Sequence, residues 1–463
     1  MNVIKTTLFL AFLLPGIYAF AQDNQARVFS LQDCIDYAVE HNPSLKIARL
    51  ERNISSTQVG ETRAEGFPQI SADMRLSHNF EPQKMRIDPS QFFGGDSTNG
   101  NGAPEQKEEI ISFSIPYEGS AALSVNQLIF NGSYFVGLAA AKTYKQLADK
   151  QYIQSKIDLI ENVTKAYYAA LISRERLELA RTNLGRLDTL YRETQIMYDN
   201  GFAEKIDVDR VRVQLINTRT QYHSLQRLDE VNQRLLKFQM GMPLSEPVRL
   251  AGSIADIDLD IDERLIPLDF EYASRVEFQQ LEVNESLTKL SLRNNAVQYL
   301  PQINAFLNYG YNTGSFEFGQ LFKFGERWLS YGSYGLSISV PIFDGLAKSY
   351  RIQRNRIELE QLAHQKKLLQ SQIDLEVEQS YALFRNNTEI MLAQKENMET
   401  ANEVFRVTKI KYQEGVGSNL EVVDAEAAYK EAETNYYNAL YDALIAKVDL
   451  EKALGILGKE TNR

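Results

Sequence analysis

The chain has 463 residues, of which 44% are hydrophobic and 24% are charged, and its formal net charge is −11 at pH 7. This acidic balance excludes the basic surface by which proteins bind nucleic acid, so no nucleic-acid partner is expected. A single cysteine, Cys34, and four scattered histidines provide neither a disulfide framework nor a cluster at metal-ligand spacing. Glycine-rich phosphate loops and Gly-x-Ser-x-Gly nucleophile motifs do not occur. The sequence therefore predicts no catalytic, cofactor or metal site, and so no enzyme.

Residues 1–21 have the pattern of a secretory signal peptide. Lys5 precedes an apolar run at residues 8–14, and Ala19-Phe20-Ala21 places small residues where a signal peptidase cleaves. The mature chain is therefore expected to begin near Gln22 and to be exported. Beyond that point no run of about 18 apolar residues occurs, so the sequence predicts no membrane-spanning helix.

Several short motifs recur in the same order, which indicates an internal duplication. The recurring elements are Pro-Gln-Ile at 68–70 and 301–303, Ile-Phe-Asn/Asp-Gly at 129–132 and 342–345, Tyr-x-x-Gly at 198–201 and 412–415, and the glycines Gly241 and Gly455. We predict a first repeat over residues 22–242 and a second over 264–456, with a linker at 243–263 and a tail at 457–463. The first copy is longer between its first two motifs, where the Gly-, Asn- and Ser-rich residues 88–104 predict an exposed loop.

Each repeat contains two stretches in which apolar and polar residues alternate, which predicts a β-hairpin over about 68–128 and another over about 301–343. In the first stretch Ile70, Ala72 and Met74 share one face. Such alternation is typical of a transmembrane β-barrel wall, but an ordinary soluble hairpin with one buried face has it too. Aromatic residues favour the membrane alternative, because rings suit the headgroup depth of a bilayer. In the second hairpin they are Phe306, Tyr309, Tyr311, Phe316, Phe318, Phe322, Phe324, Trp328 and Tyr331.

Two long helical hairpins are predicted over about 134–241 and 347–455. Their first arms, residues 134–198 and 347–412, contain no proline, and each could extend ~100 Å as one helix. Alternating steps of three and four residues along both arms predict a coiled-coil seam. The seam positions are Leu177, Ala180, Leu184, Leu187, Tyr191, Thr194 and Tyr198, and then Met391, Gln394, Met398, Ala401, Phe405, Thr408 and Tyr412. Gly201 and Gly415 follow directly and can take the positive φ that ends a helix.

Four strands per chain are too few to close a barrel, since bacterial barrels begin at about eight. An open sheet edge is not tolerated in hydrocarbon, so several chains would have to share one barrel in contact with membrane lipid. Two chains would give eight strands with a filled interior, and three would give twelve strands with a lumen. The long helices of the same copies would assemble into a second tube.

These motifs resemble the TolC-like family of outer-membrane efflux proteins, the outer membrane factors. The likeness rests on the Leu31-x-x-x-Ile35-x-x-Ala38-x-x-x-Asn42-Pro43-x-Leu45 start, the Pro-Gln-Ile strand openings, the Pro341-to-Gly345 turn and the Tyr-x-x-Gly turns. It implies a mixed α and β membrane protein: a homotrimer with a twelve-stranded β-barrel in the outer membrane, four strands per chain, continued by a long α-helical barrel in the periplasm. It also implies a passive conduit of a tripartite efflux or type I secretion system. An inner-membrane pump would supply the energy, and a periplasmic adaptor, or membrane fusion protein, would dock on the helical tips.

The resemblance further implies a periplasmic gate carried by Tyr412, Glu421 and Asp424. The spacing of three places both carboxylates on one helix face, so three chains would stack them into acidic rings that attract cations. The alternative is that they only stabilise the positive end of the helix beginning near Ser418 and face solvent. Gly417 stands where some members have an arginine that holds the gate shut across chains, so the resemblance does not supply that latch here.

Gly201, Phe202, Gly415 and Val416 are the predicted docking tips for the adaptor, because each turn glycine is followed by an apolar residue that a partner can cover. The sequence leaves two other function classes open. A periplasmic coiled-coil adaptor would share the long helices but lack paired strands with aromatic tips. A structural envelope protein would share the strands but leave the duplicated, glycine-ended hairpins unexplained.

Overall fold

The computed structural model describes residues 27–81, 84–87, 109–112, 115–252, 254 and 270–458. The predicted signal peptide and the predicted loop at 88–104 lie outside them. Within the described ranges no helix combines the length and apolar composition needed to cross a lipid bilayer. The chain forms two compact units, each assembled from three segments: a turn unit (1–41, 162–259 and 392–441) and a strand unit (42–161, 260–391 and 442–463).

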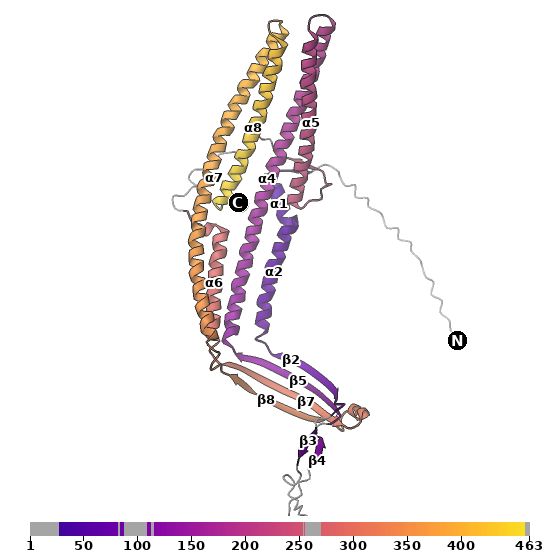
Figure 1. Ribbon diagram of the computed structural model, residues 1–463, viewed down its shortest axis with the longest axis vertical. Coiled ribbons are helices and arrows are strands. Elements are labelled where there is room, and N and C mark those ends of the chain that lie inside the picture. The colour runs from indigo at the N-terminus through magenta and orange to yellow at the C-terminus, as the bar shows by residue number, and fades with distance from the viewer. Residues whose placement is uncertain are drawn as a thin grey trace, which may run out of the picture. The chain divides into compact units, whose positions relative to one another are not determined.

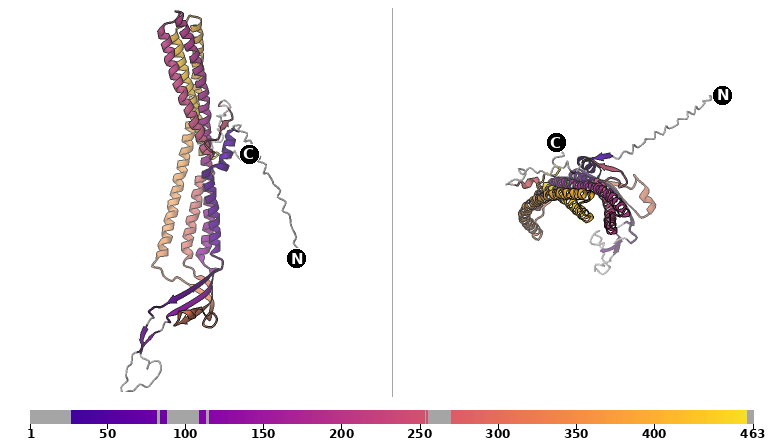
Figure 2. Two further views of the ribbon diagram at one scale, coloured as in Figure 1. Left: turned by 90° about the vertical axis from the view of Figure 1, so that its right-hand side faces the viewer. Right: turned by 90° about the horizontal axis from the view of Figure 1, so that it is seen from above.

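The strand unit contains a four-stranded antiparallel sheet that twists along its length (Figures 1 and 2). Its strands are β2 (Gln69–His78), β5 (Tyr117–Phe130), β7 (Gln302–Ser315) and β8 (Leu329–Ser339), in the order β2-β5-β7-β8. Thus β2 and β5 come from the first predicted repeat, β7 and β8 come from the second, and the β5–β7 pairing joins them. A separate two-stranded ladder pairs β3 (Lys84–Ile87) with β4 (Glu109–Ser112).

The pairing register places the apolar residues of all four strands on the same face. Ile70 lies opposite Val125, Val125 opposite Leu307, and Leu307 opposite Tyr334. This face is exposed, with 66% of Ile70 accessible and 86% of Tyr334. The predicted alternation is therefore confirmed. The exception that the sequence contains, Phe306, packs its ring against the opposing Gly335 on the polar face.

Aromatic residues crowd the connection between β7 and β8, which includes the short 3₁₀ helix η4 (Phe318–Phe322). Phe316, Phe322 and Phe324 are each at least half exposed. Trp328 is different, because it is 9% exposed and its ring nitrogen donates to the Leu321 carbonyl at 2.9 Å. One end of the sheet thus carries several exposed aromatic rings beside a buried tryptophan, on which Phe324 stacks.

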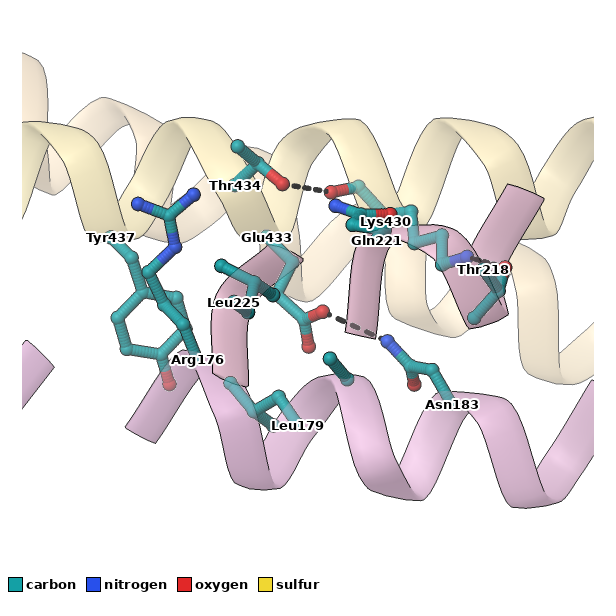
Figure 3. Close-up of a pocket in the computed structure, with 11 residues that line it drawn as sticks. Arg176, Leu179, Asn183, Thr218, Gln221, Leu225, Lys430, Glu433, Thr434 and Tyr437 are labelled. Atoms are coloured by element: carbon teal, nitrogen blue, oxygen red, sulfur yellow. Dashed lines mark hydrogen bonds between the residues drawn. The ribbon is translucent and has the colours of Figure 1, made fainter. Parts of the chain in front are cut away.

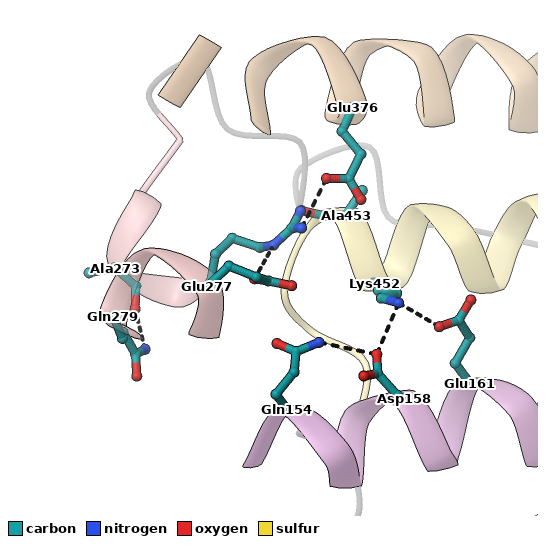
Figure 4. Close-up of polar contacts among 10 residues, drawn as sticks. Gln154, Asp158, Glu161, Ala273, Glu277, Gln279, Glu376, Lys452 and Ala453 are labelled. Atoms are coloured by element: carbon teal, nitrogen blue, oxygen red, sulfur yellow. Dashed lines mark hydrogen bonds and ion pairs between the residues drawn. The ribbon is translucent and has the colours of Figure 1, made fainter. Parts of the chain in front are cut away.

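Helices α2 (Pro43–Ala64) and α6 (Val276–Val297) lie in the strand unit with parts of α4 (Gly132–Asp199), α7 (Ala347–Gln413) and α8 (Asn419–Ala453). Arg275 binds the end of α8 through the Ala453 carbonyl at 2.8 Å and also contacts Glu376 of α7 at 2.9 Å. Lys452 of α8 bonds to Asp158 and Glu161 of α4 (Figure 4). The same unit contains a small apolar cluster made of Phe384, Ala446, Leu450 and Leu454.

The turn unit contains the ends of the long helices with α5 (Lys205–Met240) and α1 (Leu31–His41), and a parallel ladder of β1 (Arg27–Phe29) with β6 (Val248–Leu250). All seven predicted seam positions of α7 are buried or half-buried, whereas every other residue from 392 to 411 except Lys409 is exposed. The seam of α4 is likewise covered except at Tyr198. The predicted coiled-coil seams are therefore confirmed.

Each long helix ends at its predicted glycine. Gly201 has φ 80° and Gly415 has φ 72°, a conformation that is costly for residues with a Cβ. The Gly201 amide donates to Tyr198 at 2.9 Å, and the Phe202 amide donates to Met197 at 2.8 Å. The same pair of bonds recurs at Gly415, at Gly241 and at Gly455. This is the Schellman arrangement, which satisfies the last carbonyls of a helix.

We expect Gly310→Ala to disrupt the β5–β7 pairing. A Cβ at this position would lie 2.6 Å from the Ala121 carbonyl oxygen, and that backbone atom cannot move without breaking the ladder. The loss in unfolding free energy should be about 1–3 kcal/mol, as for other overpacked sites. Thermal unfolding in detergent measures it. Gly319→Ala is the control, because nothing lies within 4 Å of its added methyl; equal stability of the two variants would contradict this account.

Candidate functional site

The turn between α4 and α5 exposes an apolar side chain and balances its own charge. Phe202 is 84% exposed. The Glu204 amide donates to the carboxylate of Asp207 at 3.2 Å, so Asp207 stabilises the start of α5. Arg210 lies 3.6 Å from the same carboxylate. The first turn therefore presents a hydrophobic residue beside a paired acid.

The turn between α7 and α8 has a similar backbone but a different charge. Val416 is 79% exposed. Ser418 accepts a hydrogen bond from the Glu421 amide at 3.2 Å and caps the start of α8. Both Glu421 and Asp424 are exposed, and neither has an ion-pair partner in the described part of the chain. The matching first-turn positions are Asp207 and Arg210, so the second turn carries two uncompensated acids where the first carries an ion pair.

Tyr412, the third predicted gate residue, is held by neighbours other than the two acids. Its hydroxyl donates to the Met197 sulfur at 3.7 Å and accepts from the Asn419 amide group at 3.4 Å. Tyr412 thus links the end of α7 to α4 and to the first turn of α8. In the described ranges it forms no hydrogen bond to Glu421 or Asp424. One chain therefore holds the three predicted gate residues near one turn without joining them in one cluster.

Gly417 is tightly enclosed. A Cβ there would lie 3.1 Å from both the Cβ of Lys411 and the amide nitrogen of Tyr412. Any larger residue in place of Gly417, arginine included, would therefore crowd the end of α7.

A group of buried and half-buried polar residues lies between the α4–α5 hairpin and the α7–α8 hairpin in the turn unit, and it was not among the predicted sites. Its members, here called the polar layer, are Asn183, Arg186, Thr218, Glu426, Lys430 and Glu433. The Asn183 amide group donates to Glu433 at 3.1 Å (Figure 3). Lys430 donates to Thr218, and Arg186 donates to Asn183. The layer therefore connects α8 to both α4 and α5.

Burial shifts the pKa values of the ionisable groups in the polar layer. Glu426 is 2% exposed and Glu433 is 8% exposed, and this burial raises the pKa of both carboxyl groups. Burial also lowers the pKa of Lys430. The Arg186 guanidinium lies over the rings of Phe405 and Tyr429, at 5.6 and 5.8 Å from their centroids. A cavity of about 30 Å³ adjoins Glu433, with Arg176, Gln221 and Tyr437 in its lining (Figure 3).

The sequence did contain a signal for this layer. Glutamate and lysine four residues apart on a helix usually indicate a solvated face, so the charge pattern of α8 predicts exposure where the layer is buried. However, Glu426 and Glu433 are seven residues apart and in phase with Leu440, which is 3% exposed. The heptad phase, rather than the residue type, indicated burial.

Residues 34–239 and 272–456 match the family model described as outer membrane efflux protein. The chain belongs to this family. It is therefore an outer-membrane channel of the efflux and secretion class, as the sequence resemblance predicted, and not a periplasmic adaptor or a structural envelope protein. The family is one of transport proteins.

Named relatives span almost the whole chain. The probable efflux pump outer membrane protein TtgC of Pseudomonas putida is 24% identical over 435 residues, which cover 92% of this chain and 83% of the relative. The alkaline protease secretion protein AprF of Pseudomonas aeruginosa is 22% identical over 475 residues, which cover 99% and 89%.

Solved structures share the fold. A membrane protein from Pseudomonas aeruginosa superposes with a TM-score of 0.71 at 18% identity, with 92% of each chain covered. CusC superposes with a TM-score of 0.70 at 17% identity, with 92% of this chain and 91% of that chain covered.

We expect cysteines placed at Phe202 and Val416 to react with a maleimide at once, and native Cys34 not to react. Cys34 is fully buried, and burial raises the pKa of its thiol to about 12, so little thiolate exists at neutral pH. Phe202→Cys and Val416→Cys should each take up one label per chain, measured by mass spectrometry. Val422→Cys is the matched control, since this site is 1% exposed. Rapid labelling of the parent chain would contradict the described packing.

Proposed function

We propose that this channel is the passive conduit of a tripartite efflux or type I secretion system. The observation that carries the proposal is the exposed apolar face of the β2-β5-β7-β8 sheet, in a chain whose family resides in the outer membrane. An apolar face of this extent needs lipid or another protein to cover it. The opposite, polar face then lines the path of the cargo.

Three chains would form the conduit. The outer edges of β2 and β8, of ten and eleven residues, pair with no strand in the described part of the chain. In a trimer, β2 of one chain would pair with β8 of the next and give twelve strands, four per chain, around a lumen. The long helices would continue the conduit as an α-helical barrel in the periplasm.

An internal duplication gives this assembly its regularity. Repeats over 22–242 and 264–456, joined by the linker 243–263, would each supply two strands and one helical hairpin. Matching Schellman turns at Gly201 and Gly415, and at Gly241 and Gly455, support the duplication.

An inner-membrane pump would power transport through a periplasmic adaptor that docks on Gly201, Phe202, Gly415 and Val416. Phe202 and Val416 are the residues offered to it, because each is almost fully exposed directly after a rigid turn. Relatives named for an efflux pump and for protease secretion support the two system classes.

Cysteines at Phe202 and Val416 should form crosslinks in cells to the periplasmic adaptor, identified by mass spectrometry of the adduct. Exposed apolar residues on a rigid turn are what a partner covers, and burial of each should protect it from soluble maleimide. Glu360→Cys, an exposed position on α7 in the strand unit, is the control and should give no such adduct. Adducts from Glu360→Cys, with none from either tip, would place the adaptor elsewhere.

We also propose that Tyr412, Glu421 and Asp424 form the periplasmic gate. Six unpaired carboxylates from three chains would attract cations into a narrow passage. Trivalent cations should therefore block the current from the periplasmic side in planar bilayers, and the double variant Glu421→Gln with Asp424→Asn should lose the block and part of its cation preference.

The helix-capping alternative expects a different result. If both acids only stabilise the start of α8, the double variant should lose some helix stability and keep its ion selectivity. The control is Glu431→Gln, which removes one negative charge from an exposed position on the same helix and should leave the cation block unchanged. Unchanged cation block in the double variant would remove Glu421 and Asp424 from the gate.

A further inference from the structure

The polar layer places charged residues in helix seams whose neighbouring positions are largely apolar. Toward the turns, Leu187, Val211 and Val422 are each at most 1% exposed. On the other side, Ala180 and Leu440 continue the packing. Between them α4 contributes Asn183, α5 contributes Thr218, and α8 contributes Glu426 and Glu433. Two glutamates and a lysine thus occupy the place where a leucine layer would hold the two hairpins together.

This layer is incompletely satisfied. In the described part of the chain, one carboxylate oxygen of Glu426 and the Nε of Arg186 are buried without a hydrogen-bond partner. A buried charge that lacks partners is costly, and apolar residues of similar volume often pack more stably at such sites. The charges regain hydration as soon as water reaches them. The layer therefore weakens the contact between the hairpins more than an apolar seam would.

We propose that the polar layer is the release point of the channel: it makes the packing of the α7–α8 hairpin against the α4–α5 hairpin reversible, so that the hairpins can separate when the conduit opens. This rests on the proposed function, since only a conduit that opens needs such a release. Asn183–Glu433 and Lys430–Thr218 fix the register of the packed state, and hydration of the glutamates stabilises the separated state.

The direction of a pH effect follows from the environment of the glutamates. Arg186 and Arg176 reach the layer from α4, Lys409 from α7, and Lys430, Tyr429 and Tyr437 from α8, whereas α5 offers the uncharged Thr218 and Gln221. Burial raises the pKa of Glu426 and Glu433 in spite of these cations. The packed state therefore binds protons more tightly than the hydrated, separated state. Acidification from neutral pH should favour packing, and a rise in pH through the raised pKa values should favour separation.

Opposite substitutions test the proposal in the full-length channel, recorded in planar bilayers. Glu426→Gln with Glu433→Gln removes the buried negative charges, so the open probability should fall, on the order of tenfold for 1.4 kcal/mol of added preference for packing. Arg186→Met removes one of the cations that face both glutamates, so the open probability should rise. The parent should open less often at pH 5 than at pH 7, and the double glutamine variant should show little of this dependence. Thermal unfolding should give a higher Tm for the glutamine variant and a lower Tm for Arg186→Met.

Matched controls are Glu431→Gln and Arg181→Met, exposed residues on α8 and α4 that should leave the open probability unchanged. If the parent conducts and the layer variants open as often as the controls, the release point is wrong and the conduit stands. Changes of the same sign in both layer variants also overturn the release point. If the parent carries no current, the proposed function fails, and the release point fails with it.

Discussion

Backbone hydrogen bonding at the edges of the four-stranded sheet constrains the rest of the molecule. Strands β5 and β7 are paired on both sides, but β2 and β8 are each paired on one side only within the described residues. In hydrocarbon every backbone group without a partner costs several kcal/mol, so such edges must be completed. The described residues of one chain contain no further strand that pairs with these two edges. In the proposed trimer, neighbouring copies would complete these edges, and their long helices would be brought together as a consequence.

Local sequence signals explain the helical hairpins. Helices of 68 and 67 residues need an uninterrupted run without proline and a stop that satisfies their last carbonyls. Gly201 and Gly415 supply that stop, and the bonds of the Phe202 and Val416 amides complete it. The residue after each of these two glycines is exposed, Phe202 to 84% and Val416 to 79%. The turn that ends each of these helices thus also carries an exposed apolar residue.

The sequence predicted those features that depend on neighbouring residues in the chain. Alternation placed Ile70 and its partners on one face, and steps of three and four identified Leu187 and Phe405 as seam residues, which are indeed buried. It did not predict which strand of the first hairpin meets the second, because the pairing of Val125 with Leu307 joins residues far apart in the chain. It also missed the polar layer, because local charge pattern cannot distinguish a solvated face from a seam. Tyr412 was placed with Glu421 by resemblance, whereas its actual hydrogen-bond partners come from α4 and from Asn419.

Within the turn unit, the two turns and the polar layer have different proposed roles: the turns bind a partner, and the layer lets the hairpins separate. Schellman turns satisfy the last helix carbonyls at the tips, and in the proposed assembly the exposed apolar residue beside each turn is the surface offered to a partner. The seam positions between the turns and the polar layer are mostly apolar, and in the described residues they contain no buried charge. A charged layer inside such a seam is different, since water competes for it and a small input of binding energy can therefore separate the helices. If an adaptor docks at Phe202 and Val416 as proposed, its binding energy would act through the helices on the layer that contains Glu426 and Glu433.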